Sequence, residues 1–163
     1  MEFKEEYEYD ASIDAIWAML SDPSYAILRA SKLQLADPEV SVDASSDRIS
    51  STTRVAVPTE MLPAAAKRFI SPNTEAVLAE KWTRPSNDVI RGQLELSAAG
   101  VPANIKLVSV LTADGTKTKV VSDGNVKVTI PLLGKRLESE AVKFAPMIIK
   151  GEQEASAEYL ASH

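Results

Sequence analysis

Residues 2–10 alternate between apolar and polar side chains. Phe3, Tyr7 and Tyr9 share one face, and charged residues fill the other face. A period of two that includes aromatic residues predicts a half-buried β-strand. Glu5 is the exception, because its position places a carboxylate on the apolar side of the strand.

Two short helices are predicted after this strand. Ser12 is a suitable N-cap for the first helix, in which apolar residues recur at helical spacing over residues 13–20. Asp22 followed by Pro23 marks the start of the second, since Asp caps a helix and Pro fits its first position. We expect this second helix to end near Lys32.

Alternation then returns in six segments, which predict six more strands. They lie around residues 40–42, 49–57, 74–84, 89–96, 105–111 and 118–130. The Asp114-Gly115 pair between the last two strands is typical of a tight hairpin turn. One antiparallel sheet of about seven strands, with one face in water, accounts for the whole pattern.

Residues 58–73 interrupt the strands with three prolines and a group of apolar side chains. This composition predicts a short amphipathic helix that includes Leu62, Phe69 and Ile70. Such a helix either caps one edge of the sheet or acts as a lid over a pocket.

The C-terminal segment, from Lys135 to about Ala161, has the strongest helical pattern of the chain. Its apolar stripe includes Leu137, Phe144 and Ile148. Pro146 lies inside the stripe, and a proline inside a helix removes one hydrogen bond and bends the helix. We expect one long helix with a bend.

Composition excludes several kinds of chemistry. The chain of 163 residues has no Cys, and its only His, His163, is the last residue. Disulfides, thiolate nucleophiles, zinc–thiolate sites and an internal histidine base are therefore excluded. We expect no metal site and no cofactor. The length is that of one domain, residues 1–163.

Charge and hydropathy bear on partners and location. The net charge of -5 opposes binding to nucleic acid. Residues 1–50 carry 4 basic and 11 acidic groups, whereas residues 101–150 carry 8 basic and 4 acidic groups.

The acidic N-terminus does not resemble a signal peptide, and no run of about 18 apolar residues predicts a membrane span. We therefore expect a cytoplasmic protein, while its oligomeric state has no signal in the sequence.

Three segments carry a resemblance to a known superfamily. They are residues 130–138 (IPLLGKRLE), which join the last strand to the long helix, Ala15–Trp17 and Glu80–Trp82. With the order of elements, they resemble the START, polyketide-cyclase and birch-pollen-allergen superfamily (SRPBCC), in particular an uncharacterised branch, a domain of unknown function. The resemblance implies one START-like domain with the α+β helix-grip fold, a curved sheet wrapped around the long C-terminal helix. It also implies a cavity between helix and sheet that often holds a lipid, sterol or polyketide. No catalytic residue is carried over.

The strand at residues 74–84 offers the clearest candidate polar group. Glu75 and Lys81 prefer water, which turns Leu78, Glu80 and Trp82 inward and places a carboxylate beside an indole. Glu80 either contacts a ligand in an apolar space or pairs with a basic side chain at the rim of the sheet. Glu5 presents the same two alternatives.

The leading hypothesis is the binding of a hydrophobic, lipid-like or polyketide-like small molecule between helix and sheet. The alternatives are a protein-interaction module with a filled cavity and, with less support, an enzyme of the cyclase or dehydratase type that uses Glu80 or Glu5. The residues expected to contact the ligand are Tyr7, Leu78, Glu80, Trp82, Ile90, Leu94, Leu107, Val126, Phe144 and Ile148. The residues expected to form a lid are Leu62, Phe69 and Ile70.

Overall fold

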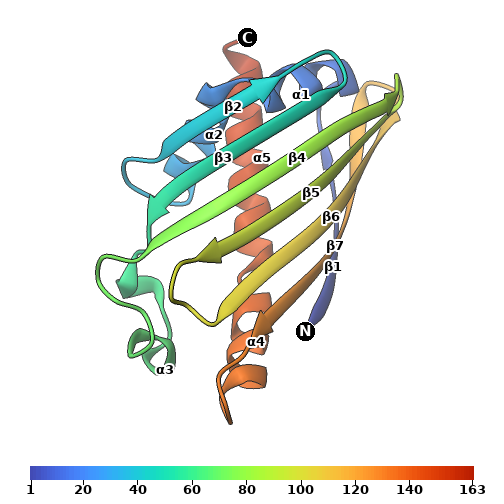
Figure 1. Cartoon of the computed structure of the whole chain (residues 1–163). Helices are drawn as coiled ribbons and strands as arrows, with labels where there is room; N and C mark the ends of the chain where they lie inside the picture. The colour runs from blue at the N-terminus through green and yellow to red at the C-terminus, as the bar shows by residue number, and fades with distance from the viewer.

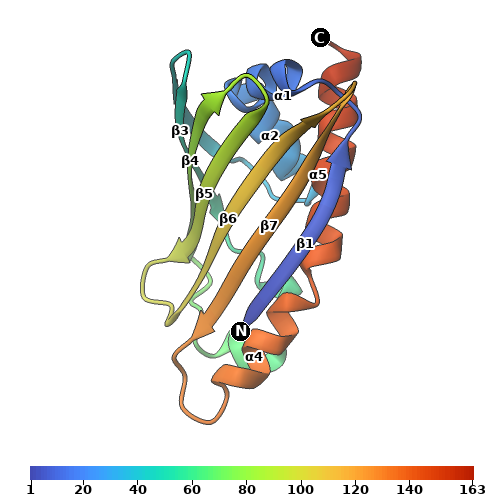
Figure 2. The ribbon, with the colours of Figure 1, turned by 90° about the vertical axis from the view of Figure 1, so that its right-hand side faces the viewer.

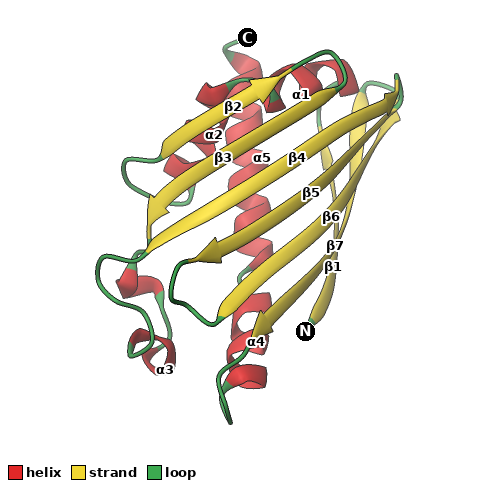
Figure 3. Ribbon diagram, in the orientation of Figure 1, coloured by secondary structure: helices red, strands yellow, loops and turns green.

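The sheet and the C-terminal helix organise the whole chain, and the computed structural model describes residues 1–163 (Figures 1 and 3). The elements follow in the order β1 (Glu2–Tyr9), α1 (Ile13–Leu20), α2 (Pro23–Lys32), β2 (Glu39–Ala44), β3 (Arg48–Ala56), the 3-10 turn η1 (Thr59–Met61), α3 (Ala64–Lys67), β4 (Glu75–Ser86), β5 (Val89–Ala98), β6 (Ala103–Asp114), β7 (Lys117–Val128), α4 (Gly134–Val142) and α5 (Ala145–Ala161). The seven strands form one sheet in the order β1-β7-β6-β5-β4-β3-β2.

Every pair of neighbouring strands is antiparallel, and the first strand pairs with the last through β1 and β7. The sheet curves, and α5 runs along its concave side next to β1 (Figure 2). This arrangement confirms the expected α+β helix-grip architecture.

The starts of the two N-terminal helices agree with the sequence prediction. The Ser12 hydroxyl accepts a hydrogen bond from the Ala15 backbone N–H at 3.2 Å. The Asp22 carboxylate accepts one from the Ser24 backbone N–H at 2.9 Å. Both caps satisfy amide groups that have no partner within the helix.

The C-terminal helix is divided into two. α4 ends at Val142, α5 begins at Ala145, and Pro146 occupies the first turn of α5. A proline in a first turn removes no intrahelical hydrogen bond, because the first amides of a helix have no acceptor. The expected bend is therefore present, but as a break before Pro146 and not as a kink inside one continuous helix.

The amphipathic helix expected over residues 58–73 is much shorter than predicted. Only the turn η1 and the four residues of α3 are helical, and neither buries a side chain. The prolines in this segment favour extended backbone in the residues that precede them, which limits each helical run. The segment lies at the same end of the molecule as α4 (Figures 1 and 2).

The hydrophobic core lies at the opposite end, where α1 and α2 pack on the concave face of the sheet. Its largest fully buried side chains include Ile16, Met19, Tyr25, Ile90 and Leu111. Trp82 belongs to this core and lays its ring over Gly92 of the neighbouring strand, where any added Cβ atom would overlap the indole. None of the helices combines the length and the apolar character needed to span a lipid bilayer.

Candidate ligand-binding site

The inward-facing side of the sheet has a packed half and a hollow half. In the packed half, Ile90 on β5 and Leu111 on β6 are 0% and 1% exposed. Further along the same strands, Leu94 and Leu107 also face inward, yet they are only half-buried. Leu78 on β4 also faces inward and is also only half-buried. Apolar side chains that face the inside without being covered border an unfilled space.

That space is a cavity of about 250 Å³, lined by 27 residues of which 21 are hydrophobic. The sheet forms one wall, and α2 together with the α4–α5 junction forms the other. Ala141 and Ala145 line it at this junction, where small side chains leave room beneath the break in the helix. A cavity of about 150 Å³ accommodates benzene, so this volume suits a ligand of modest size.

A buried ion pair separates the packed half from the cavity. Glu80 points inward from β4 with 3% of its surface exposed, and Arg29 reaches it from α2 with 6% exposed. Arg29 Nη2 donates to Glu80 Oε2 at 2.7 Å and Nη1 donates to Oε1 at 3.1 Å, so the pair is bidentate. The Ser51 hydroxyl on β3 donates to Glu80 Oε2 at 3.1 Å. These hydrogen bonds replace the interactions with water that the two charged groups lose on burial.

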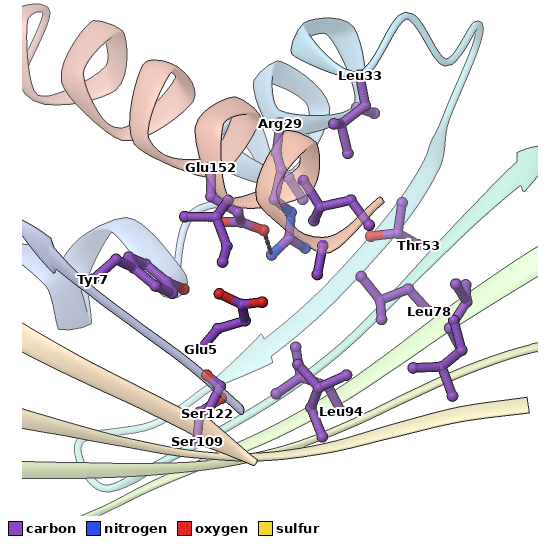
Figure 4. A pocket seen from close by; sticks show the side chains of 18 of the residues that line it. Glu5, Tyr7, Arg29, Leu33, Thr53, Leu78, Leu94, Ser109, Ser122 and Glu152 are labelled. Carbon is purple, nitrogen blue, oxygen red and sulfur yellow. Dashed lines mark hydrogen bonds and ion pairs between the residues drawn. The ribbon is translucent and has the colours of Figure 1, made fainter. Parts of the chain in front are cut away.

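Glu152 on α5 extends this network into the cavity wall. Its Oε1 accepts a hydrogen bond from Arg29 Nη1 at 3.3 Å (Figure 4). Its Oε2 accepts one from the Tyr25 hydroxyl at 2.7 Å. Burial by itself lowers the pKa of Arg29, but the carboxylates of Glu80 and Glu152 raise that pKa well above its usual value. Burial, followed by the charge of Glu152, raises the pKa of Tyr25. The guanidinium stays charged and the phenol stays neutral.

Two hydroxyl groups on neighbouring strands of the sheet add further polar atoms to the cavity wall. Ser109 on β6 and Ser122 on β7 lie opposite each other, and their hydroxyl oxygens are 2.7 Å apart. Ser122 in turn lies opposite Glu5 on β1. Burial, followed by the charge of Glu152, raises the pKa of Tyr7 above its usual value. The cavity therefore has an apolar body with a few polar groups distributed over its wall.

Glu5 and Thr53 have polar atoms without protein partners. The Glu5 carboxylate lines the cavity and makes no hydrogen bond or ion pair with the rest of the chain. The Thr53 hydroxyl on β3 is buried without a partner and also belongs to a cavity-lining residue. Figure 4 shows Glu5 pointing from β1 into the space that Thr53 and Leu78 border from the other side.

Most residues expected to contact a ligand do line the cavity, but three do not. Those that line it are Tyr7, Leu78, Trp82, Leu94, Leu107, Val126 and Ile148. Glu80 lies behind the wall, held by Arg29 and Ser51, so it is neither an open ligand contact nor a residue of the sheet rim. Ile90 lies in the packed half, and Phe144 lies at the break between α4 and α5 outside the lining. Contact of any of these residues with a ligand stays a prediction.

The three residues expected to form a lid do not line the cavity. Leu62 and Ile70 are half-buried, and Phe69, which is 36% exposed, borders a separate surface groove with Arg54 and Glu75. The segment that carries them is nevertheless at the same end of the sheet as the cavity-lining α4–α5 junction (Figure 1). Their role as a gate stays a prediction.

Sequence reasoning missed the central residue of the site, Arg29. A signal was available, because Arg29 follows Tyr25 by four positions and shares a helical face with Ala26 and Ala30. A lone arginine on an apolar face predicts a buried acidic partner. Glu152 and Thr53 had no comparable signal, since each resembles an ordinary polar residue of its helix or strand.

Comparison with known proteins relates the chain to a family and to several solved structures. A family model described as "Protein of unknown function (DUF2505)" matches residues 4–160. No curated protein matches the chain. The crystal structure of TTHA0849 from Thermus thermophilus has 15% identity and a TM-score of 0.57, with 98% of this chain and 99% of that chain covered.

Two further structures show the same architecture. A START superfamily protein from Mycobacterium smegmatis has 14% identity and a TM-score of 0.55, covering 97% of this chain and 98% of that one. Norcoclaurine synthase from Thalictrum flavum, crystallised with dopamine and hydroxybenzaldehyde, has 15% identity and a TM-score of 0.57, covering 100% of this chain and 87% of that one. At these identities the likeness concerns the fold. The chain therefore belongs to the DUF2505 family and has the helix-grip fold of the START and birch-pollen-allergen superfamily.

Proposed function

We propose that the protein binds a small, mainly apolar molecule in the cavity between the sheet and α5. The observation that carries this proposal is the row of inward-facing but uncovered leucines, Leu78, Leu94 and Leu107, which border about 250 Å³ of space. Covering such side chains with a ligand removes apolar surface from water, at about 25 cal/mol per Å². A folded protein leaves this surface unpacked at a cost to its own stability, and ligand binding offsets that cost.

The volume favours the smaller members of the expected lipid-like or polyketide-like class. Pockets for drug-sized ligands span about 300–1,000 Å³, and this cavity lies just below that range. A short alkyl chain or a molecule of one or two rings fits better than a complete sterol. The norcoclaurine synthase with the same fold was crystallised with dopamine and hydroxybenzaldehyde, which are molecules of this size class.

A fluorescence titration with N-phenylnaphthylamine, an uncharged apolar dye, tests the proposal. The wild-type protein should enhance the dye fluorescence with a saturable, one-site curve. Leu107→Trp should abolish the enhancement, because the added ring fills the cavity from β6. Val108→Trp is the matched control, since Val108 is the next residue of the strand, faces outward and is 53% exposed. Equal dye binding by both variants would contradict the proposal.

The alternatives have less support. A protein-interaction module was expected to have a filled cavity, and this cavity is not filled. Acid–base catalysis by Glu80 is disfavoured because both of its carboxylate oxygens are already hydrogen-bonded to Arg29. We assign no catalytic residue.

The place of residues 58–73 near the α4–α5 junction is compatible with the proposed gating role of Leu62, Phe69 and Ile70. If Phe69 controls access, Phe69→Ala should change the association and dissociation rates of the dye by the same factor and leave its affinity unchanged. Stopped-flow mixing measures both rates. Unchanged association and dissociation rates would contradict the gating role of these residues.

A further inference from the structure

The charges inside the curved sheet do not balance. Among the residues that line the cavity, Arg29 is the one basic side chain and Glu5 and Glu152 are acidic. Arg29 forms ion pairs with Glu152 and with Glu80, which lies just behind the wall. The charge of the guanidinium is already shared by two carboxylates, because Nη2 binds Glu80 at 2.7 Å and Nη1 binds both Glu80 at 3.1 Å and Glu152 at 3.3 Å. A ligand that enters the cavity therefore meets an excess of negative charge.

Glu5 is the carboxylate without compensation. It lies between Phe3 and Tyr7 on the inward face of β1, opposite Ser122, whose hydroxyl is engaged with Ser109. The neighbouring Lys4 points to the outer face, where its ammonium pairs with Glu6 at 3.7 Å. Glu5 is half-buried, and its carboxylate oxygens keep some contact with solvent in the free protein. A carboxylate that loses this contact when a ligand enters needs a cation or a hydrogen-bond donor in its place. The missing partner is one that a ligand can supply.

Thr53 is an independent sign of a ligand with polar groups. Its side chain is 7% exposed, its Oγ1 atom has no hydrogen-bond partner, and it lines the same cavity from β3. Buried hydroxyls are nearly always hydrogen-bonded, so an unpartnered one in a cavity wall points to a group that arrives with a ligand. Glu5 and Thr53 border the cavity from opposite sides (Figure 4).

We propose that the ligand carries a protonated amine on its apolar body and that Glu5 binds this ammonium group. This inference rests on the proposed small-molecule binding and specifies its ligand class. Phe3 and Tyr7 also line the cavity on either side of Glu5, and an ammonium group that meets the face of either ring gains a further attraction. An anionic ligand is disfavoured, because it would approach Glu5 and Glu152 while the charge of Arg29 is already shared between Glu80 and Glu152.

A matched series of octylamine, octanol and octanoate tests the charge preference, with displacement of N-phenylnaphthylamine at pH 7 as the readout. The three molecules share one alkyl chain and differ in head-group charge, and a primary amine is protonated at this pH. We expect octylamine to bind roughly tenfold or more tightly than octanol, the factor typical of one hydrogen bond to a charged group. Octanoate should bind least tightly.

The variant Glu5→Gln should reduce the affinity for octylamine to that for octanol and leave octanol binding unchanged. Glu6→Gln is the matched control, because Glu6 is the next residue and its side chain, 56% exposed, faces the outside.

The remaining outcomes separate this inference from the proposed function. Equal affinities for the three molecules, or tightest binding of octanoate, would overturn the amine preference while small-molecule binding stands. Failure of the dye and of all three molecules to bind would overturn both.

Discussion

Arg29 on α2 and Glu80 on β4, 51 positions apart in the chain, meet in two parallel hydrogen bonds inside the curved sheet. Trp82, two residues after Glu80, is 6% exposed and belongs to the core, although it also borders the cavity. Leu78, two residues before Glu80, is only half-buried in the cavity wall. The ion pair thus marks the boundary between the two halves of the interior. It also joins the N-terminal helices to the sheet at the place where the packing ends.

Loss of one partner of this pair should destabilise the protein strongly. Arg29→Leu leaves Glu80 buried without its cation, and removal of one partner from a buried pair costs about 3–5 kcal/mol. Urea denaturation followed by tryptophan fluorescence measures the free energy of unfolding. The double variant Arg29→Leu/Glu80→Leu should recover part of the loss. A single-variant loss below about 1 kcal/mol would show that the pair is not a structural element of the interior.

Two leucines on one strand should respond differently to the same truncation. Leu111→Ala should cost about 2–5 kcal/mol, because Leu111 is 1% exposed and its removal opens a new void in the packed half. Leu107→Ala should cost clearly less, because Leu107 already borders a void. Thermal and urea denaturation of the two variants provide the comparison. Equal losses would mean that the cavity half is packed as tightly as the core.

Asp22 should make stability depend on pH in the acid range. The backbone N–H of Ser24, with help from the Tyr159 hydroxyl, holds the pKa of Asp22 below its usual value. A lowered pKa stabilises the folded state above the usual value of about 4, and this contribution is lost as the pH falls below it. Asp22→Ala removes the N-cap of α2 and should cost about 1 kcal/mol near neutral pH.

The test of this prediction is the stability difference between wild type and Asp22→Ala as a function of pH. The difference should stay constant from about pH 8 to pH 6 and shrink from about pH 5 to pH 3. A difference that is independent of pH down to about pH 3 would contradict the assignment of the cap.

Much of the architecture could be predicted from the local pattern. Alternation over residues 2–10 and 74–84 predicts strands with the correct inward faces, on which Glu5, Glu80 and Trp82 lie. The pattern leaves open whether the two carboxylates are buried or lie at the rim of the sheet. Side-chain direction in a strand has a period of two and depends only on neighbouring residues. The helix starts at Ser12 and Asp22 were equally local, because a cap needs only the next few backbone amides.

The division of the interior into a core and a cavity was decided by tertiary structure. Leu111 and Leu107 are the same residue type on the same face of β6, and only what packs opposite each one makes the first buried and the second a cavity wall. The pairing of Arg29 with Glu80 and the isolation of Glu5 also depend on elements far apart in the chain. The sequence by itself determined which side chains face inward, because that choice follows from backbone periodicity. The tertiary structure decided which of them find a partner, because contact depends on distances that the curvature of the sheet and the position of the helices set.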